Sequence, residues 1–244
     1  MPNNCDEIEY RIIGQEMQAV IVTLDPAEQV LAEAGSMLYM TEGIDMQASI
    51  DPSAGGGFFG GLVKGMGRIF TGESFFITTF TNRGKARADV AFSAPYPGKI
   101  LPLDMEELGG RLLCQKDAFL CAARGTEISV AFQKKIGSGF FGGEGFILQC
   151  LEGDGLCFVH AGGTVFEIEL QDRQPLRIDT GCLVAFQPSV DYDIEWVGGV
   201  KNALFGGEGF FFATLTGPGK VYLQTLPISR LADRLASARR RLIR

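Results

Sequence analysis

Three glutamates recur at the same place in a repeated phrase, and carboxylates repeated in this way could act together. The phrase reads Phe-x-Gly-Glu-x-Phe, and its glutamates are Glu73, Glu144 and Glu208. If three units packed about one axis, these carboxylates would lie on a ring or in three equivalent grooves, where they could bind a cation, an amine or a partner. The alternative is structural, because a buried charge is normally paired or hydrogen-bonded, here to the glycine turn or to a Lys or Arg. We favour the structural interpretation and keep the three glutamates as candidate ligand- or partner-binding residues.

A glycine-rich insertion in the first repeat, residues 51–68, carries a second candidate binding surface. It contains Phe58 and Phe59 within the run Gly-Gly-Gly-Phe-Phe-Gly. Two aromatic rings on a surface loop could meet a partner or a membrane surface, and the same segment could equally be a packed connector. The insertion is too short to span a bilayer.

The residue types needed for catalysis are sparse. His160 is the only histidine, and neither a Gly-x-Ser-x-Gly nor a Cys-x-x-Cys motif accompanies it. From the spacing of the repeats its equivalents are Asp89 and Gln224, so we expect it at a polar strand position. Cys150 and Cys157 could face each other across two strands, but no further ligands stand at a metal-binding spacing. The sequence therefore predicts no catalytic residue, no metal site and no cofactor.

The repeated phrase indicates one supersecondary unit used three times. Each copy runs without a gap to a glycine eleven residues past its glutamate, at Gly84, Gly155 and Gly219. Short β-branched and aromatic runs flank these glycine turns, which predicts strands joined as hairpins. The expected hairpins are 73–89, 144–160 and 208–224. The predicted fold class is mainly β, a single domain of three β-sandwich repeats packed as a pseudo-three-fold unit, with repeats at about 10–96, 97–161 and 162–227.

The end of the chain, residues 228–244, is the one segment with a helical period. Leu231, Leu235 and Leu242 lie on one face of the predicted helix. Six arginines and one aspartate give this segment a charge of +5 out of a net −7, which leaves −12 on the rest of the chain. The helix could bind anionic lipid or an acidic partner, or dock on its own β body with its arginines in water. The acidic body makes nucleic acid an unlikely partner, because phosphate binding usually needs a basic surface.

The N-terminal residues and the cysteines bear on the compartment. The segment 1–9 is acidic and polar, unlike a secretory signal or a transit peptide, and no apolar run approaches the roughly 18–20 residues of a membrane span. Six cysteines without a paired motif are expected to be buried reduced thiols. We therefore expect a cytoplasmic protein and leave a peripheral association with the inner membrane open.

The chain resembles a known family in three places. These are the tripled Phe-x-Gly-Glu-x-Phe phrase, the Gly-Gly-Gly-Phe-Phe-Gly insertion at 55–60, and the closing Gly-Pro-Gly-Lys-Val-Tyr-Leu-Gln-Thr-Leu at 217–226. They are similar to the altered-inheritance-of-mitochondria family, whose members have a domain like that of the tryptophan RNA-binding attenuation protein. The resemblance implies three such β units in one chain, and an association of the eukaryotic members with the mitochondrial inner membrane. It supplies no catalytic residues, and likeness of fold alone does not carry tryptophan or RNA binding to this chain.

These observations favour a non-enzymatic scaffold or binding protein that acts through protein or membrane-surface contacts. Its expected partners are another protein, further copies of itself, or a peripheral membrane surface. The alternative is a small-molecule-binding module with the ligand held between repeats. An enzyme or an RNA-binding protein fits the sequence less well.

Overall fold

Short strands account for most of the chain that the structure describes. The structure is a computed structural model, and it describes residues 5–49, 77–134, 146–197 and 210–242. The strands are rich in β-branched and aromatic side chains, which pack well on a pleated surface.

The strands form three successive units of six. A separate strand, β1 (Glu9–Ile13), precedes the first unit. The first unit contains β2 (Ala19–Leu24), β3 (Gln29–Glu33), β4 (Met37–Met40), β5 (Ile44–Ser49), β6 (Ile77–Asn82) and β7 (Ala88–Ser93). The second unit contains β8 (Gly98–Asp104), β9 (Arg111–Gln115), β10 (Phe119–Ala123), β11 (Glu127–Lys134), β12 (Phe146–Glu152) and β13 (Leu156–Gly162). The third unit contains β14 (Val165–Leu170), β15 (Pro175–Asp179), β16 (Leu183–Phe186), β17 (Asp191–Val197), β18 (Phe210–Thr216) and β19 (Gly219–Gln224).

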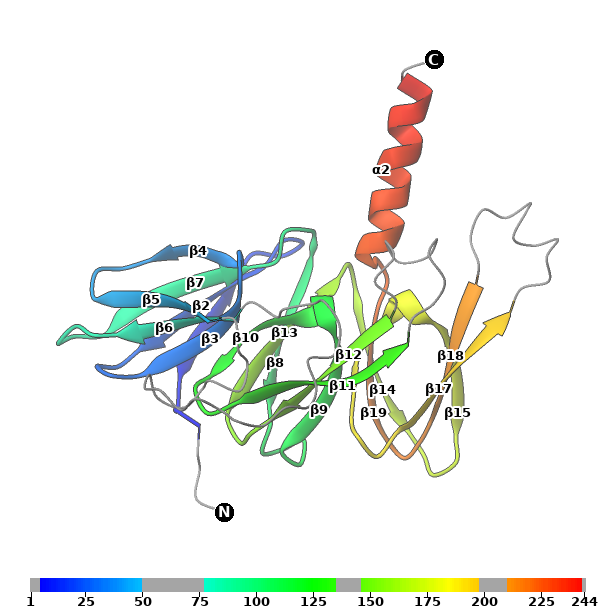
Figure 1. Cartoon of the computed structure of the whole chain (residues 1–244), viewed down its shortest axis with the longest axis horizontal. Helices are drawn as coiled ribbons and strands as arrows, with labels where there is room; N and C mark the ends of the chain where they lie inside the picture. The colour runs from blue at the N-terminus through cyan, green and yellow to red at the C-terminus, as the bar shows by residue number, and fades with distance from the viewer. Residues whose placement is uncertain (1–4, 50–76, 135–145, 198–209, 243–244) are drawn as a thin grey trace, which may run out of the picture.

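Each unit divides its strands between two sheets, and the two inner sheets are shared by neighbouring units. The first sheet has the order β1-β2-β7-β4 and the fourth has the order β15-β18-β17. The second sheet is β5-β6-β3-β10-β13-β8, and the third is β11-β12-β9-β16-β19-β14. At both shared junctions the strands pair antiparallel, β3 with β10 and β9 with β16. Figure 1 shows the resulting row of units, from the blue strands of the first to the yellow and orange strands of the third.

Three hydrophobic cores lie between the four sheets. The pairs of buried residues that represent them are Val22 and Phe80, Phe119 and Leu112, and Phe186 and Leu215. An inner sheet faces a core on both sides, so its central strands are buried on both faces. This is why β12 and β13 are almost wholly buried and do not alternate between apolar and polar residues.

The register of strand pairing makes the three units equivalent. In each unit the third strand pairs with the sixth, and a register shift interrupts the pairing at the same place. The residues just past the shift and their partners are Tyr39 and Ala91, Cys121 and Phe158, and Ala185 and Tyr222. An irregularity at one position in all three units is a shared structural feature, because bulges are specific features of a strand pair.

The three expected hairpins are wrong in their pairing. The strands on either side of each turn belong to different sheets, β6 and β7 in the first unit, β12 and β13 in the second, and β18 and β19 in the third. The turn therefore carries the chain across the sandwich. Strands buried on both faces read as continuous apolar runs, and such runs do not distinguish a hairpin from a crossing between sheets.

The turn between β6 and β7 is four residues longer in the first unit than in the others. Ala91 and Phe158 each pair with the same residue position in the third strand of their unit, so they are equivalent. They lie 67 residues apart. Before the turn the equivalent residues are Ile77 and Leu148, which are 71 residues apart. The ungapped alignment of the repeats is therefore wrong from this turn onward.

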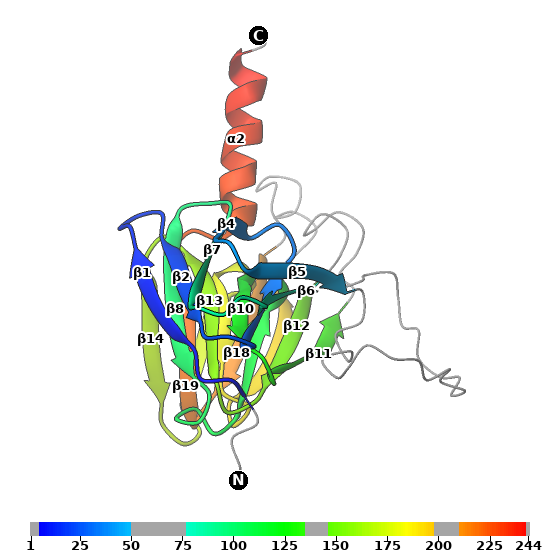
Figure 2. The ribbon, with the colours of Figure 1, turned by 90° about the vertical axis from the view of Figure 1, so that its left-hand side faces the viewer.

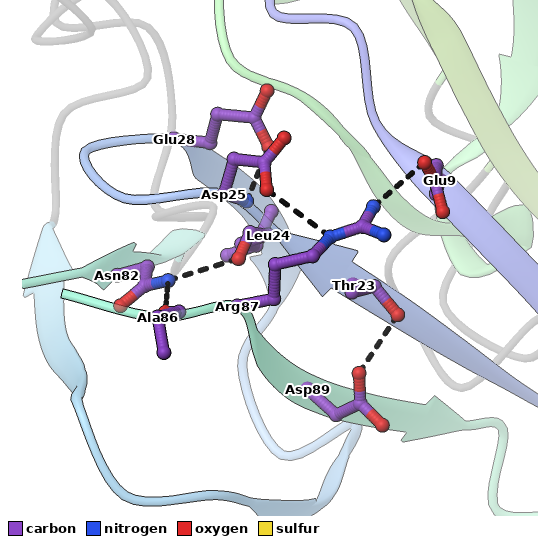
Figure 3. Close-up of polar contacts among 9 residues, drawn as sticks. All are labelled: Glu9, Thr23, Leu24, Asp25, Glu28, Asn82, Ala86, Arg87 and Asp89. Carbon is purple, nitrogen blue, oxygen red and sulfur yellow. Dashed lines mark hydrogen bonds and ion pairs between the residues drawn. The ribbon is translucent and has the colours of Figure 1, made fainter. Parts of the chain in front are cut away.

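Asn82 fixes this longer turn (Figure 3). Its fully buried amide nitrogen donates to the carbonyl oxygens of Leu24 at 2.9 Å and Ala86 at 2.8 Å. Its side-chain oxygen accepts a hydrogen bond from the N–H of Gly84 at 2.9 Å. One side chain thus ties the turn to the end of β2 and closes the turn on itself.

Replacement of Asn82 by alanine is expected to lower the free energy of unfolding by roughly 2 kcal/mol, because the buried carbonyl of Leu24 loses its donor. The matched control is Arg87→Ala on the same turn. Arg87 bridges Glu9 and Asp25 with N–O distances of 2.7 and 3.1 Å (Figure 3). These pairs are exposed, so the control should cost clearly less than Asn82→Ala. Urea unfolding of both variants checks the prediction, and equal losses would contradict it.

The mainly β fold with a C-terminal helix is confirmed. The helix is α2 (Ile228–Leu242). The predicted repeat limit at 96 falls between β7 and β8, and the limit at 161 falls one residue before β13 ends. The pseudo-three-fold packing stays a prediction, because the pairing of the described strands joins the units in a row.

Candidate functional site

The candidate binding residues named from the sequence lie outside the described residues. They are Glu73, Glu144, Glu208, Phe58 and Phe59. Their grouping on a ring or in grooves, and the role of the insertion at 51–68, stay predictions. The site is therefore built from the side chains that the structure describes.

His160 lies at the junction of the first and second units, and one of its expected equivalents is wrong. The strand register makes Ser93 and Gln224 its counterparts. Asp89 is not one of them, because the longer turn of the first unit shifts the register by four residues. Asp89 instead accepts a hydrogen bond from Oγ1 of Thr23 at 2.7 Å (Figure 3).

The His160 ring is buried against Tyr96. The two ring centroids are 4.5 Å apart and the rings meet edge to face. Burial lowers the pKa of His160 to about 4, so the ring is neutral at pH 7. Its Nδ1 is buried and has no hydrogen-bond partner within the described part of the chain. A histidine whose pKa is this low is a weak base at neutral pH, which makes this ring poorly suited to act as a general base.

Two carboxylates stand near this ring pair, at the end of β3 and in the 3₁₀ turn Lys116–Ala118. The pKa of Glu33 is raised to about 7, mainly by burial and also by the negative charge of Asp117, while Lys116 opposes the shift. Burial also raises the pKa of Tyr96 to about 12, together with the charges of Asp117 and Glu33. Perturbed titratable groups in one place can mark a functional site, but structural networks perturb pKa values too.

The second junction, between the second and third units, has amide side chains at the equivalent positions. Gln115 occupies the place of Glu33 there, and its Nε2 donates to the carbonyl oxygen of Thr180 at 2.8 Å. Gln224 occupies the place of His160, accepts from the N–H of Gly162 at 2.8 Å and donates to the carbonyl of Gly181 at 2.9 Å. Uncharged amides thus satisfy the backbone between units. The first junction has titratable side chains, Glu33 and His160, at the positions that these amides occupy.

Burial disfavours the thiolate form of three cysteines. Burial raises the pKa of Cys157 to about 12 and raises those of Cys114 and Cys121 as well, which disfavours the thiolate form. Cys150 and Cys157 lie in different sheets, so the expected cross-strand pair is wrong. Across the described residues, no group of three or more His, Cys, Asp or Glu side chains could hold a metal ion.

An apolar strand edge is exposed at one end of the row. The four residues of β4 are all exposed, with Leu38 at 55% and Tyr39 at 42%. The equivalent strands β10 and β16 are completely buried. Exposed contiguous apolar residues of this kind commonly mark an interaction site. We call Met37–Met40 the β4 edge.

At its first turn the helix α2 is tied to the body by an ion pair. Arg230 donates to Asp179 at 2.6 Å. The N–H of Leu231 donates to the carbonyl of Pro227 at 3.3 Å, which is the i to i−4 bond of the first helical turn. Figures 1 and 2 both show the rest of α2 projecting away from the sheets. Leu235 is 63% exposed. In the residues that the structure describes, no helix is long and apolar enough to cross a membrane.

The geometry defines a class: a β-repeat protein whose sandwiches share their sheets and which presents an apolar edge and a basic helix. The chain belongs to the family described as mitochondrial biogenesis AIM24, whose model matches residues 10–226. This confirms the resemblance drawn from the repeated phrase.

Two streptococcal proteins are similar along nearly the whole chain. The protein named "Uncharacterized protein M6_Spy0233", from Streptococcus pyogenes serotype M6, is 30% identical over 227 residues, which are 91% of this chain and 88% of that protein. The crystal structure of protein SPYM3_0169 from Streptococcus pyogenes has a TM-score of 0.74 and 26% identity, and the match covers 95% of this chain and 100% of that one.

The β4 edge and the Glu33 position were not found from the sequence. The sequence does contain a signal for the edge. Met37–Met40 aligns with the strands 119–122 and 183–186, which each pair with a strand of the preceding repeat. The first repeat has no preceding repeat to supply such a strand. The signal for Glu33 was its alignment with Gln115, which has an uncharged amide at the equivalent position.

Proposed function

We propose that this protein is a non-enzymatic binding scaffold that attaches to an anionic membrane surface through α2. The observation that carries the proposal is the exposure of Leu235 on a helix that projects away from the sheets (Figures 1 and 2). An isolated helix of this length is marginal in water, so its apolar stripe is expected to be covered in use.

The charges on α2 favour an anionic surface. Arg234 and Arg239 are exposed on the helix, and the segment 228–244 carries +5. Each basic residue near an anionic bilayer contributes about 1 kcal/mol of attraction. A leucine stripe flanked by arginines is the usual composition of a helix that lies in the membrane interface.

The acidic body does not cancel this attraction. A helix of 15 residues is about 22 Å long, whereas the Debye length at physiological salt is about 8 Å. The body, which carries a charge of −12, can therefore lie farther from an anionic surface than the distance over which the repulsion is strong. This separation supports α2 as the point of contact.

The other candidate functions have less support. At the described junctions the strands of neighbouring units pair directly and their side chains are buried. No specific observation among the described residues therefore supports a small molecule held between repeats. Catalysis is disfavoured by the low pKa of the buried histidine and by the raised pKa values of the buried thiols.

Replacement of Leu235 by glutamate is expected to lower binding to vesicles rich in phosphatidylserine about tenfold or more, because a buried leucine contributes roughly 1.5–3 kcal/mol. The matched control is Val130→Glu on β11, which changes the charge equally at a residue of 50% exposure. Flotation of wild type and both variants measures the effect. Equal binding by the two variants, or equal binding to neutral phosphatidylcholine vesicles, would contradict the proposal.

A further inference from the structure

The first strand of each unit pairs with the sixth strand on one side and has an outer edge on the other. These first strands are β2, β8 and β14, and the register of their pairing makes Ile21, Pro102 and Glu167 equivalent positions. Figure 2 shows β1, β8 and β14 on one side of the row, with β5 and β11 on the other. An uncovered strand edge presents N–H and C=O groups with which another chain can pair. The three units differ in what covers this edge.

The outer edge of β2 is filled by β1. The two strands pair antiparallel, with Arg11 opposite Ile21. The guanidinium of Arg11 also pairs with the carboxylate of Asp89 at 3.3 Å. The first unit thus completes its edge with an alternating strand of its own chain, Glu9–Ile13.

The outer edge of β8 is closed by the segment before β2 and by a proline. The N–H of Gly98 donates to the carbonyl of Glu16 at 2.7 Å. The N–H of Ile100 donates to Oε1 of Gln18 at 2.7 Å. Because bonding directions alternate along a strand, the next outward position is Pro102, which has no N–H. A proline there closes the rest of the edge to a further strand.

The outer edge of β14 has no such cover. This strand ends the third sheet, and within the described residues no strand pairs with its outer side. The register makes Gly163 the counterpart of Gly98, so the outward positions on β14 are Val165, Glu167 and Glu169. All three residues have an N–H, in contrast to the proline of β8. The third unit therefore presents an edge at which a strand can be added.

The side chains of β14 specify which kind of strand fits. On one face Lys220 lies opposite Glu169 and pairs with Glu167 at 2.9 Å, so two carboxylates share one cation. On the other face Phe166 is 53% exposed and Ile168 is half-buried. Side chains alternate between the two faces of a strand. A complementary strand therefore has basic residues that alternate with apolar ones.

We propose that the outer edge of β14 binds an extended segment of another protein in which basic and apolar residues alternate. The segment takes the place on β14 that β1 takes on β2. Since Arg11 lies opposite Ile21, the same register puts a basic residue of the partner opposite Glu167. The apolar residues on either side of it then lie opposite Phe166 and Ile168. Main-chain bonds contribute affinity in this mode of binding, and the alternate side chains contribute specificity.

A second copy of this chain is a poorer occupant than a basic segment. Two β14 edges paired with each other would bring their glutamates together on one face, and like charges on paired strands are destabilising. β1 of a second copy would bring Glu9 opposite Glu169, because Glu9 lies opposite the equivalent residue Thr23 in its own chain. The charge of −12 on the body also attracts a basic partner.

Two matched peptides test the proposal. The probe is a fluorescent peptide with the sequence Gly-Lys-Tyr-Arg-Ile-Lys-Gly, and in the control peptide its three basic residues are glutamates. Fluorescence anisotropy at low salt should show that the full chain binds the basic peptide at least about tenfold more tightly than the acidic one. The affinity for the basic peptide should fall as the salt concentration rises.

Variants of β14 separate strand pairing from attraction of charge alone. Glu167→Pro removes an outward N–H together with the charge, and Pro102 already occupies the equivalent position of β8. This variant should weaken binding of the basic peptide about tenfold. Glu167→Gln keeps the N–H and should weaken binding only about two- to fivefold. Glu169→Lys should weaken it about fivefold or more, whereas the control Glu107→Lys, at another exposed position, should not.

The outcomes decide the proposal even if the proline variant does not fold. Absence of binding at millimolar basic peptide, or equal binding of the acidic peptide, would overturn it. Equal effects of Glu169→Lys and Glu107→Lys would place the peptide elsewhere on the acidic body. Equal effects of folded Glu167→Pro and Glu167→Gln would show that no strand pairs with β14, which overturns it as well. Vesicle binding through α2 can fail or succeed without affecting these results.

Discussion

Replacement of Glu33 by glutamine should stabilise the protein at pH 8, by up to about 3 kcal/mol, and should change little at pH 4. The folded-state pKa of this carboxyl is raised from 4.5 to about 7, mainly by burial. Below pH 4.5 the group is protonated in both states and has no effect. As the pH rises through 4.5 to 7, the unfolded chain ionises first, so ionisation lowers the free energy of unfolding and the loss is complete above pH 7. Glutamine cannot ionise and removes this loss.

The second junction indicates that glutamine fits the site. Gln115 stands at the equivalent position and donates to a backbone carbonyl of the next unit. The control is Glu107→Gln at an exposed position, which changes the net charge equally. Urea unfolding at pH 8 and pH 4 measures both variants. Stabilisation of equal size at the two pH values, or in the control, would show that the buried carboxylate is not the cause.

Replacement of Gly98 by alanine should cost roughly 3 kcal/mol, the upper end of the usual range for an overpacked site. A Cβ atom at Gly98 would lie within 3.0 Å of the carbonyl oxygen of Ala161 and of Nε2 of His160. The backbone has little room to move away, because the N–H of Gly98 donates to the carbonyl of Glu16 at 2.7 Å. Either β8 or the buried histidine must shift.

The control for this prediction is Gly109→Ala. Gly109 has a φ of +85°, and a Cβ there would meet nothing within 4 Å. Its substitution should cost about 1–2 kcal/mol from backbone conformation alone. Thermal or urea unfolding compares the two variants. If Gly98→Ala were no worse than Gly109→Ala, the contact between β8 and His160 would not limit the packing of the junction.

The sequence predicts the repeated architecture because the signals for it are local. Glycine turns and short apolar runs recur with the phrase, so three units and a mainly β fold follow from spacing alone. The partners of the strands are not local. β3 pairs with β10 of the next unit, and nothing in the residues 29–33 distinguishes that partner from a neighbour in sequence. The hairpin prediction failed for this reason.

The candidate site was predictable only in part. The helix, with its leucine stripe and arginines, was found because amphipathic periodicity is visible in sequence; of its possible docking surfaces, its own β body is disfavoured by the exposure of Leu235. The position of His160 was misaligned because the extra turn residues lie where the glycine spacing looked regular. A gap of four before β7 would have aligned it with Ser93.

The shared sheets also affect how the protein unfolds. Half of the second sheet comes from the first unit and half from the second, and the third sheet divides in the same way. A fragment cut between β7 and β8 would leave β3 with a bare edge and would expose Leu31, which lies in the core of the following unit. The repeat that is visible in the sequence is therefore not the piece that can fold alone. Hydrogen exchange should find the central unit opening only when both of its neighbours open with it.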